Sequence, residues 1–278
     1  MNPPNSTVSA LDPARIEALQ TFLLEWYDAN RRVLPWRFTA DPYAILVSEV
    51  MLQQTQVSRV LPRFAGWLEA WPDLESLTAA PLADVLRLWQ GLGYNTRARR
   101  LRDCAVAVTD AGQRPPVLPR SLDALRALPG VGPYTARAVL IFAHNDDLAA
   151  VDANVRRVLT HQLRLPLDLP ERDVQAVADV VLPHGRSRDW HNAIMDYGSL
   201  VLTARVTGIA PRTRQSAFEG SRRQRRARLL RVLLERGPLS LAHARDALAL
   251  PRDELEALVA ALCRDGLVRL DADRLSVA

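Results

Sequence analysis

The sequence predicts an all-α protein that ends in a small module of helices and a β-hairpin. Apolar residues recur at helical spacing along most of the chain, and alternating strand patterns are confined to its end. Prolines fall mostly between the helical segments, where they end helices rather than interrupt them. Hydrophobic residues make up 48% of the 278 residues and charged residues 24%, the balance of a folded globular chain.

Helical periodicity predicts a series of separate helices over the first 205 residues. The segment 14–30 carries apolar side chains every three or four residues, and Pro42 precedes a second apolar run over 43–56. Further helices are expected over 82–88, 96–109, 122–128, 134–144, 153–161, 172–182 and 189–202.

The character of the chain changes near Arg212. Residues 212–228 are dense in Arg, Gln, Ser and Gly, which predicts a linker that runs into a helix. Helices then follow over 226–236, 241–249 and 253–264, with strands over 267–270 and 274–277. Three helices and a hairpin predict a winged-helix domain over 219–278. A helical appendage without a binding role explains the pattern equally well, because such modules contact proteins as readily as DNA.

Charge favours a polyanionic partner, since the formal net charge is +5. All 36 basic side chains are arginines, so no lysine amine is available to form a Schiff base with a sugar aldehyde. No apolar run is long enough to cross a membrane and the N-terminal residues lack a signal-peptide pattern, so we expect a cytoplasmic, nucleoid-associated monomer. The two cysteines, Cys104 and Cys263, lie in apolar helical stretches and are expected to be small buried hydrophobes.

A glycine-rich hairpin is predicted over 128–136, which reads Leu-Pro-Gly-Val-Gly-Pro-Tyr-Thr-Ala. Gly130 and Gly132 permit backbone angles that other residues avoid, and a helix begins at Pro133. The first N–H groups of that helix would bind a phosphate without reading a base. An ordinary helix–helix turn is the alternative.

A second motif follows at 151–157, Val-Asp-Ala-Asn-Val-Arg-Arg. Asp152 directly precedes a helix, and a helix cap is the commoner role for an aspartate there. The hairpin followed by Val-Asp-x-Asn-Val-x-Arg, however, resembles the helix-hairpin-helix (HhH-GPD) DNA glycosylases. The resemblance implies a core over 1–218, with a six-helix lobe over about 38–147 and a second lobe from about 10–37 plus 148–205. It also implies that Asp152 faces the anomeric carbon of a flipped nucleotide.

Within that superfamily the chain is most similar to the MutY-type adenine glycosylases. The resemblance covers about residues 14–205, and the segment around Glu49, Ser-Glu-Val-Met-Leu-Gln-Gln-Thr-Gln-Val, is its most specific part. The other similar segments are 34–37 with 41–43, 91–99 and 190–198.

Two carboxylates carry the chemistry that the resemblance implies. Periodicity alone favours a solvated surface position for Glu49, but a pocket would raise its pKa and let it protonate a purine nitrogen. Asp152, kept ionised, would stabilise the resulting sugar cation or trap it covalently. We expect both groups to meet in one cleft. Tyr134 and Asn154 complete the implied catalytic set; Tyr134 stands where lyase-competent relatives carry a lysine, which predicts a monofunctional enzyme.

The DNA is expected to lie against two loops and the hairpin. Gln54 and Tyr94 resemble the residues that fill the space left by the flipped nucleotide, although a core aromatic explains Tyr94 nearly as well. The full set of implied DNA contacts is Arg37, Gln53, Gln54, Tyr94, Arg97, Gly130, Val131, Gly132, Thr135 and Arg156. As in relatives, carbonyls near Leu128 and Val131 are candidates to hold a monovalent cation.

The chain departs from the family in two places. Four cysteines of a typical MutY-type iron–sulfur cluster would fall near Leu202, Ile209, Arg212 and Phe218, none of which can ligate iron, so no cofactor is expected. Arg205, Arg212 and Arg214 would retain the backbone contacts of that loop. The C-terminal domain that reads 8-oxoguanine in the family has no counterpart, which leaves the opposite base open.

Three functions remain. The first is excision of adenine from mispairs with guanine or 8-oxoguanine in double-stranded DNA. The second is removal of thymine or uracil from mispairs with guanine, which Tyr134 does not exclude. The third is a non-catalytic DNA-binding protein, which would need neither Glu49 nor Asp152.

Overall fold

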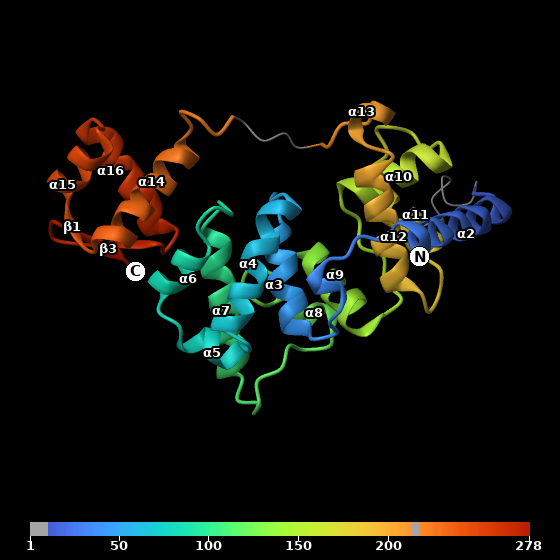
Figure 1. The fold of residues 1–278 in the computed structure, drawn as a ribbon, viewed down its shortest axis with the longest axis horizontal. Coiled ribbons are helices and arrows are strands. Elements are labelled where there is room, and N and C mark those ends of the chain that lie inside the picture. The colour runs from blue at the N-terminus through green and yellow to red at the C-terminus, as the bar shows by residue number, and fades with distance from the viewer. Residues whose placement is uncertain (1–10, 213–216) are drawn as a thin grey trace. The chain divides into compact units, whose positions relative to one another are not determined.

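The computed structural model describes residues 11–212 and 217–278, which are mostly helical with one small sheet (Figure 1). The residues group into two compact units. The first holds the described residues up to Ile45, Arg120–Arg126 and 132–212; the second holds Leu46–Pro119, Ala127–Val131 and the described residues from 217 onward. The domain boundaries expected from the sequence stay a prediction, and this grouping differs from them in placing the C-terminal module with residues 46–119.

The first unit contains Asp152 together with the helices that precede and follow it in the chain. Its α2 begins after Asp12, whose side chain accepts a hydrogen bond from the backbone N–H of Ala14. The elements of this unit are α2 (Pro13–Asn30), the 3-10 turn η1 (Pro35–Arg37), α8 (Leu122–Arg126), α9 (Pro133–His144), α10 (Ala153–Leu163), α11 (Glu171–Val181), α12 (Ser187–Leu200) and α13 (Ala204–Thr207).

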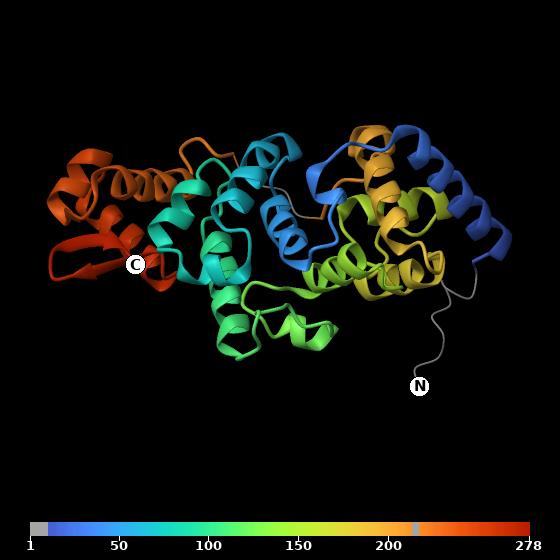
Figure 2. The same cartoon turned by 60° about the horizontal axis from the view of Figure 1, so that its bottom comes forward.

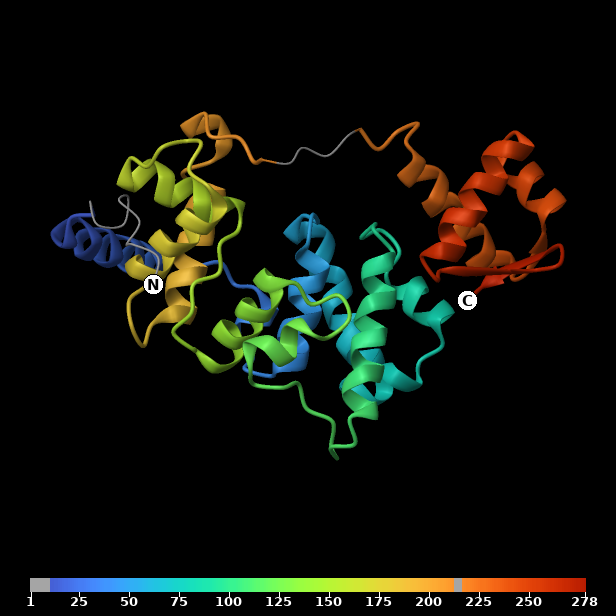
Figure 3. The same ribbon diagram turned by 180° about the vertical axis from the view of Figure 1, so that it is seen from behind.

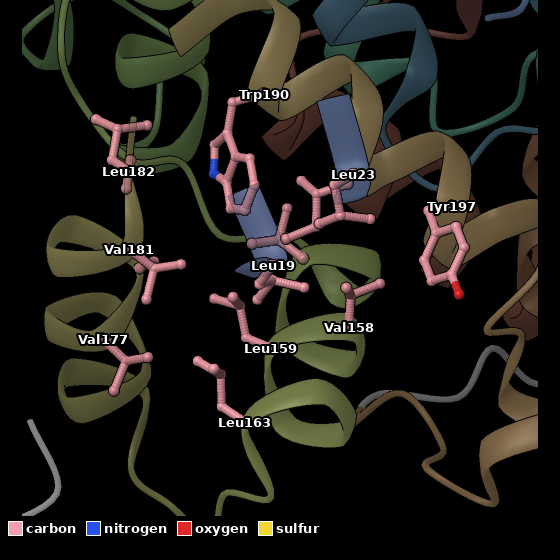
Figure 4. Close-up of a cluster of buried hydrophobic side chains, with 14 of the residues drawn as sticks. Leu19, Leu23, Val158, Leu159, Leu163, Val177, Val181, Leu182, Trp190 and Tyr197 are labelled. Carbon is pink, nitrogen blue, oxygen red and sulfur yellow. The ribbon is translucent and has the colours of Figure 1, made fainter. Parts of the chain in front are cut away.

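One hydrophobic core holds the first unit together. Helix α12 packs against α2 and α10, and Figure 2 shows α2 in blue beside α12 in orange. Side chains of α2, α10, α11 and α12 converge there, among them Leu23, Leu159 and Trp190 (Figure 4). The ring of Tyr197 meets Trp26 edge-on at 5.1 Å between centroids. This core fixes the positions of α10 and α12, which carry the candidate site.

The second unit begins with the greater part of α3 (Pro42–Leu52). It continues with α4 (Val57–Ala70), α5 (Leu74–Ala79), α6 (Leu82–Leu88) and α7 (Thr96–Asp110). Trp67 of α4 is fully buried and meets Trp71 and Trp89 edge-on at 4.7 and 5.5 Å. These aromatic contacts join α4 to the end of α6.

The C-terminal module consists of three helices and a small antiparallel sheet, as the sequence predicted (Figure 3). The strands lie in the order β1-β3-β2, and Leu275 of β3 stands opposite both Leu239 and Leu270. The elements are α14 (Arg222–Arg236), β1 (Leu239–Ser240), α15 (Leu241–Leu248), α16 (Arg252–Arg264), β2 (Val268–Asp271) and β3 (Arg274–Val277). The sequence did not predict β1, which has only 2 residues.

Several boundaries differ from those predicted. Helix α3 ends at Leu52 instead of continuing to Gln56, because Gln54 adopts a left-handed backbone with φ of 54°. Helix α8 ends at Arg126, because Leu128 precedes a proline and is disfavoured in a helix. Helix α14 begins at Arg222, four residues early, after the Ser221 cap. Across residues 11–212 and 217–278, none of the helices combines the length and apolarity of a membrane span.

Candidate active site

Asp152 is the N-cap of α10, so the interpretation as a cap is confirmed. Its Oδ1 atom accepts hydrogen bonds from the backbone N–H groups of Asn154 at 2.8 Å and Val155 at 2.7 Å. Its Oδ2 atom accepts a third from the amide Nδ2 of Asn154 at 2.9 Å. Three donors therefore hold the carboxylate in one orientation at the end of a helix whose dipole favours negative charge.

The environment of Asp152 shifts its pKa. Burial raises the pKa above the ordinary value for aspartate, and the three hydrogen bonds and the charge of Arg157 oppose this shift without cancelling it. An ionised Asp152 is the expectation from the sequence, and the raised pKa opposes ionisation. A raised pKa also makes the ionised form more basic, which suits a group that must bond to or stabilise a cation.

Arg157 holds Asn154, which in turn contacts Asp152, in place. The sequence did not predict this role. Its Nη2 atom donates to Oδ1 of Asn154 and to the carbonyl oxygen of Gly198, both at 2.6 Å, and its Nε donates to the carbonyl oxygen of Leu202 at 2.6 Å. Asn154 and Arg157 are three residues apart and share one face of α10. The spacing of three residues between Asn154 and Arg157 in the motif is the feature of the sequence that could have predicted this role of Arg157.

Gly198 allows α12 to approach α10 closely. A Cβ atom at this position would lie 2.9 Å from the Cβ of Asn154 and 3.0 Å from Cγ2 of Val158. The glycine thus leaves room for Asn154, which in turn holds Asp152. Arg156, the neighbour that was predicted to contact DNA, donates its Nη2 to the carbonyl oxygen of Leu167 at 2.7 Å and remains partly exposed.

His191 fixes the segment that leads into Asp152. Its Nε2 atom accepts a hydrogen bond from the backbone N–H of Ala150 at 2.9 Å, and its Nδ1 lies 2.7 Å from the carbonyl oxygen of Ser187. These two partners require one neutral tautomer, with the proton on Nδ1. Burial lowers the pKa of His191 to about 4, which agrees with a neutral ring.

Tyr134 lies in the first turn of α9 and is partly buried. Its hydroxyl group is 4.0 Å from the sulfur of Met195, a weak contact with α12. Thr135, the next residue, is 3% exposed, so its side chain offers little surface to DNA and a contact there would come from its backbone. Gly132 caps α9 with an extended backbone, as expected for the end of the hairpin.

Arg37, which the resemblance implies as a DNA contact, forms a buried ion pair in this structure, and its contact with DNA stays a prediction. Its two terminal nitrogens donate to the two carboxylate oxygens of Asp196 at 2.7 and 2.8 Å, and Arg32 adds a third bond from Nε at 2.6 Å. Burial alone would raise the pKa of Asp196, but the bonds from Arg37 and Arg32 outweigh it and the pKa is lowered. The donors of Arg37 thus tie η1 to α12.

Glu49 is 8% exposed, so the solvated position that periodicity favoured is wrong. It lies on α3 between the fully buried Val47 and the buried Val50. Periodicity failed here because α3 is apolar almost all round and therefore buries a polar residue along with its neighbours. The carboxyl group of Glu49 is therefore largely shielded from solvent. That it shares a cleft with Asp152 stays a prediction.

Arg97, which the resemblance implies as a DNA contact, is buried and joins two loops, and its contact with DNA stays a prediction. Its Nη1 atom donates to the carbonyl oxygens of Val50 and Gln53 at 2.7 and 2.6 Å, among other acceptors. Its Nη2 donates to the carbonyl oxygens of Leu92 and Gly93 at 3.1 and 3.0 Å. Burial lowers its pKa to about 10, so the guanidinium stays charged at neutral pH. In this structure both Nη atoms therefore donate to acceptors of the protein itself.

The loops that Arg97 joins carry the two predicted wedge residues. Gln54 and Tyr94 both adopt left-handed backbones, with φ of 54° and 48°. Non-glycine residues seldom adopt this conformation, and it is retained where the surrounding structure enforces it. The guanidinium of Arg97 lies 5.7 Å from the centre of the Tyr94 ring. Arg97 thus joins the loop of Gln54 to the loop of Tyr94 through its hydrogen bonds.

The hairpin requires glycine at 130. Gly130 has φ of 79°, and a Cβ there would lie 2.8 Å from the Cβ of Arg100. The turn closes through a hydrogen bond from the N–H of Val131 to the carbonyl oxygen of Leu128 at 3.2 Å. The side chain of Val131 is buried, so DNA would contact its backbone. A monovalent cation at the carbonyls of Leu128 and Val131 stays a prediction.

Comparison with known proteins shows the family to which the chain belongs. Residues 47–182 match the HhH-GPD superfamily of base excision DNA repair proteins. An adenine DNA glycosylase of Mycolicibacterium smegmatis is 40% identical over 273 residues, which span 90% of this chain and 92% of that protein. The chain belongs to the HhH-GPD superfamily and, within it, to the MutY-type proteins.

Other members of the superfamily give the same picture. The adenine DNA glycosylase of Homo sapiens is 39% identical over 206 residues, 69% of this chain and 37% of that protein. A solved thermostable thymine-DNA glycosylase is 27% identical with a TM-score of 0.63, over 69% of this chain and 89% of that one. A non-covalent endonuclease III–DNA complex has a TM-score of 0.62 at 21% identity, over 73% and 91% of the two chains, and so shares the fold.

The four positions where this HhH-GPD family's iron–sulfur ligands are expected hold no cysteine. The chain has two cysteines, and the four positions expected for the cluster hold other residues. Leu202 is buried with its carbonyl bound to Arg157, and Arg212 donates Nη2 to the carbonyl oxygen of Leu169 at 2.6 Å. These residues do not fit a cluster. In the described part of the chain, no three His, Cys, Asp or Glu side chains are grouped to hold a metal ion. Arg205 is exposed, and Arg214 lies outside the described residues.

Proposed function

We propose that this protein is an adenine DNA glycosylase of base excision repair. It hydrolyses the N-glycosidic bond of an adenine that is flipped out of a mispair with guanine or 8-oxoguanine. The observation that carries the proposal is the 40% identity to the Mycolicibacterium smegmatis adenine DNA glycosylase across 92% of that protein. The burial of Glu49 and the three donors on Asp152 support the chemistry.

The proposed reaction uses the two carboxyl groups in succession. Glu49 gives its proton to a nitrogen of the adenine, and the bond between the base and the anomeric carbon breaks, its electron pair leaving with the base. The carboxylate of Asp152 stabilises the sugar cation or bonds to it. The oxygen of a water molecule then bonds to the anomeric carbon. Where Asp152 has bonded to that carbon, this bond breaks and its electron pair returns to the carboxylate, and the proton that the water loses restores Glu49. The products are free adenine and an abasic site.

The enzyme acts as a monofunctional glycosylase and leaves the abasic strand intact. The absence of lysine from the sequence supports this, because the amine that forms a Schiff base with the opened sugar is missing. A phenol, as in Tyr134, cannot form that adduct. Borohydride treatment during turnover is therefore expected to trap no covalent protein–DNA complex, whereas a trapped complex would contradict the proposal. The presence of only two cysteines supports an enzyme that works without an iron–sulfur cluster. Separately, we propose that the enzyme acts as a monomer.

The deciding experiment measures base excision from matched duplexes. Purified protein is incubated with duplexes that carry adenine, thymine or uracil opposite guanine or 8-oxoguanine, and abasic products are then cleaved with alkali. Adenine opposite guanine or 8-oxoguanine is expected to give product. The chain also shares its fold with a thermostable thymine-DNA glycosylase at 27% identity, so product from thymine or uracil alone would favour that activity instead. Absence of any product would favour a non-catalytic DNA-binding protein.

Two variants with matched controls test the assigned roles. Asp152→Asn keeps a side-chain oxygen that can cap α10, so we expect stability within about 1 kcal/mol of wild type but a loss of excision rate of about a hundredfold or more. Asp12→Asn makes the same change at the cap of α2 and is expected to keep full rate. Glu49→Gln is expected to lose rate like Asp152→Asn, and the exposed Glu75→Gln is not. Full activity in either site variant would remove that residue from the mechanism.

A further inference from the structure

Helix α14 carries an unusual density of positive charge. Seven of its 15 residues are arginines and one, Glu235, is acidic. Its buried residues are Leu229, Leu230, Val232, Leu233 and Leu234. The first two turns of the helix lie before these residues and are almost purely basic.

A groove lies within the second unit between α14 and the loops that carry Gln54 and Tyr94. Its volume is about 1180 Å³. Its lining includes six arginines and one carboxylate, that of Asp265. The arginines are Arg59, Arg223, Arg225, Arg226, Arg228 and Arg231. Such an excess of one sign in a concave surface concentrates positive potential there.

The arginines of this groove differ in how firmly the protein holds them. Arg225 pairs with Glu254, and Arg226 pairs with Asp265. Arg228 donates to the carbonyl oxygens of Ala247 and Leu248, at 2.9 and 3.2 Å. Arg59 and Arg231 are exposed and line the groove from opposite walls, one on α4 and one on α14. These two offer their charge to a bound ligand most directly.

The groove is continuous with the predicted wedge. Gln54 and Tyr94 line it, and Nη1 of Arg223 donates to the phenolic oxygen of Tyr94 at 2.7 Å. The guanidinium of Arg223 also lies 5.3 Å from the centre of the Tyr94 ring. Residues of the C-terminal module and the wedge residues thus line one continuous surface.

The remaining parts of the module are less suited to a polyanion. Winged-helix proteins related to the helix-turn-helix class place a recognition helix in the major groove. Here the third helix of the module, α16, carries three acidic and two basic side chains, so its charge disfavours DNA. The hairpin carries Asp271 and Asp273 beside Arg269 and Arg274. Positive charge is concentrated on α14 alone.

We propose that this groove binds the phosphates of double-stranded DNA beside the predicted wedge residues Gln54 and Tyr94. The C-terminal module then holds the DNA through α14 rather than through its third helix or its wing. Arginine forks bind phosphate oxygens in pairs, and each phosphate so neutralised releases counterions. The inference rests on the proposed function in taking DNA as the substrate, but it concerns binding and not excision.

The test compares two double variants of the full-length protein that remove equal charge. Arg59→Gln with Arg231→Gln alters the groove; Arg236→Gln with Arg274→Gln alters two exposed arginines outside it. Fluorescence anisotropy measures the Kd for an undamaged duplex and for a duplex with an adenine mispair, over a series of salt concentrations. Thermal unfolding establishes that both variants are folded.

The groove variant is expected to bind both duplexes on the order of tenfold more weakly at low salt. The slope of log K against log salt is expected to fall by about two, since each lost phosphate contact contributes about 0.9. The control variant is expected to retain the wild-type slope. A wild-type slope in the groove variant, or an equal loss in both variants, would overturn the inference. Wild-type protein that binds DNA but excises nothing would overturn the proposed function alone.

Discussion

Arg157 and Asn154 are joined by a hydrogen bond of 2.6 Å between Nη2 and Oδ1, one turn apart on α10. Because Arg157 takes the oxygen of the Asn154 amide, the nitrogen of that amide must point the other way, toward Oδ2 of Asp152. The arginine thus decides which end of the amide faces the carboxylate. It acts as a positioning residue, since it reaches Asp152 only through Asn154.

Replacing Arg157 with lysine is expected to impair excision more than DNA binding. Lysine keeps the charge but cannot serve Asn154, Gly198 and Leu202 at once, because it lacks the planar fork of arginine. We expect a single-turnover rate about a hundredfold lower, a Kd for mispaired DNA close to wild type, and a loss of about 1–3 kcal/mol in unfolding free energy. Arg172→Lys, at a highly exposed position of α11, is the matched control and should change the rate little. Equal rate losses in the two variants would contradict the role of Arg157.

Gly198→Ala tests the contact between α10 and α12 directly. The added Cβ would collide with Asn154 at 2.9 Å and with Val158 at 3.0 Å, so the two helices must separate. We expect a loss of about 1–3 kcal/mol in unfolding free energy, measured in urea, and a lower excision rate. Gly66→Ala in α4 is the control, because nothing lies within 4 Å of its Cβ position and alanine favours a helix by about 1 kcal/mol. A stable, fully active Gly198→Ala protein would argue against close packing at this point.

His191 predicts a specific pH dependence of stability. Its folded pKa of about 4 lies below the ordinary value of 6.5, so between these values the unfolded chain binds a proton that the folded protein does not. Stability from this residue is present above pH 6.5 and is lost as the pH falls toward 4, by about 3 kcal/mol. His191→Gln does not titrate, so its unfolding free energy should fall less over the same range. Parallel pH profiles for the two proteins would show that His191 is not responsible.

The sequence predicted the helices with strong periodicity and the hairpin, because these depend on neighbours in the chain. It missed α4, in which Pro62 and Gly66 disfavour a helix but Phe64 and Trp67 are buried. It identified Asp152 and Glu49 from motifs, whereas periodicity alone placed Glu49 at the surface, because burial depends on the whole fold. Arginines were hardest to interpret. An arginine looks the same in a sequence whether its partner is a phosphate or, as for Arg37, an aspartate 159 residues away.

Arg97 provides a test of that distinction by salt titration. If Arg97 holds the loops of Gln54 and Tyr94 and touches no phosphate, Arg97→Gln removes no counterion-releasing contact. Its DNA affinity is then expected to fall by a similar factor at every salt concentration, with the slope of log K against log salt unchanged, because the loops lose their shape. Unfolding free energy is expected to fall by about 3 kcal/mol, since several buried carbonyl groups lose their donor. The double variant Arg59→Gln with Arg231→Gln is the comparison, because there the slope falls and stability does not. A reduced slope in Arg97→Gln with wild-type stability would return Arg97 to the DNA interface, and would mean that its buried guanidinium leaves these carbonyls when DNA binds.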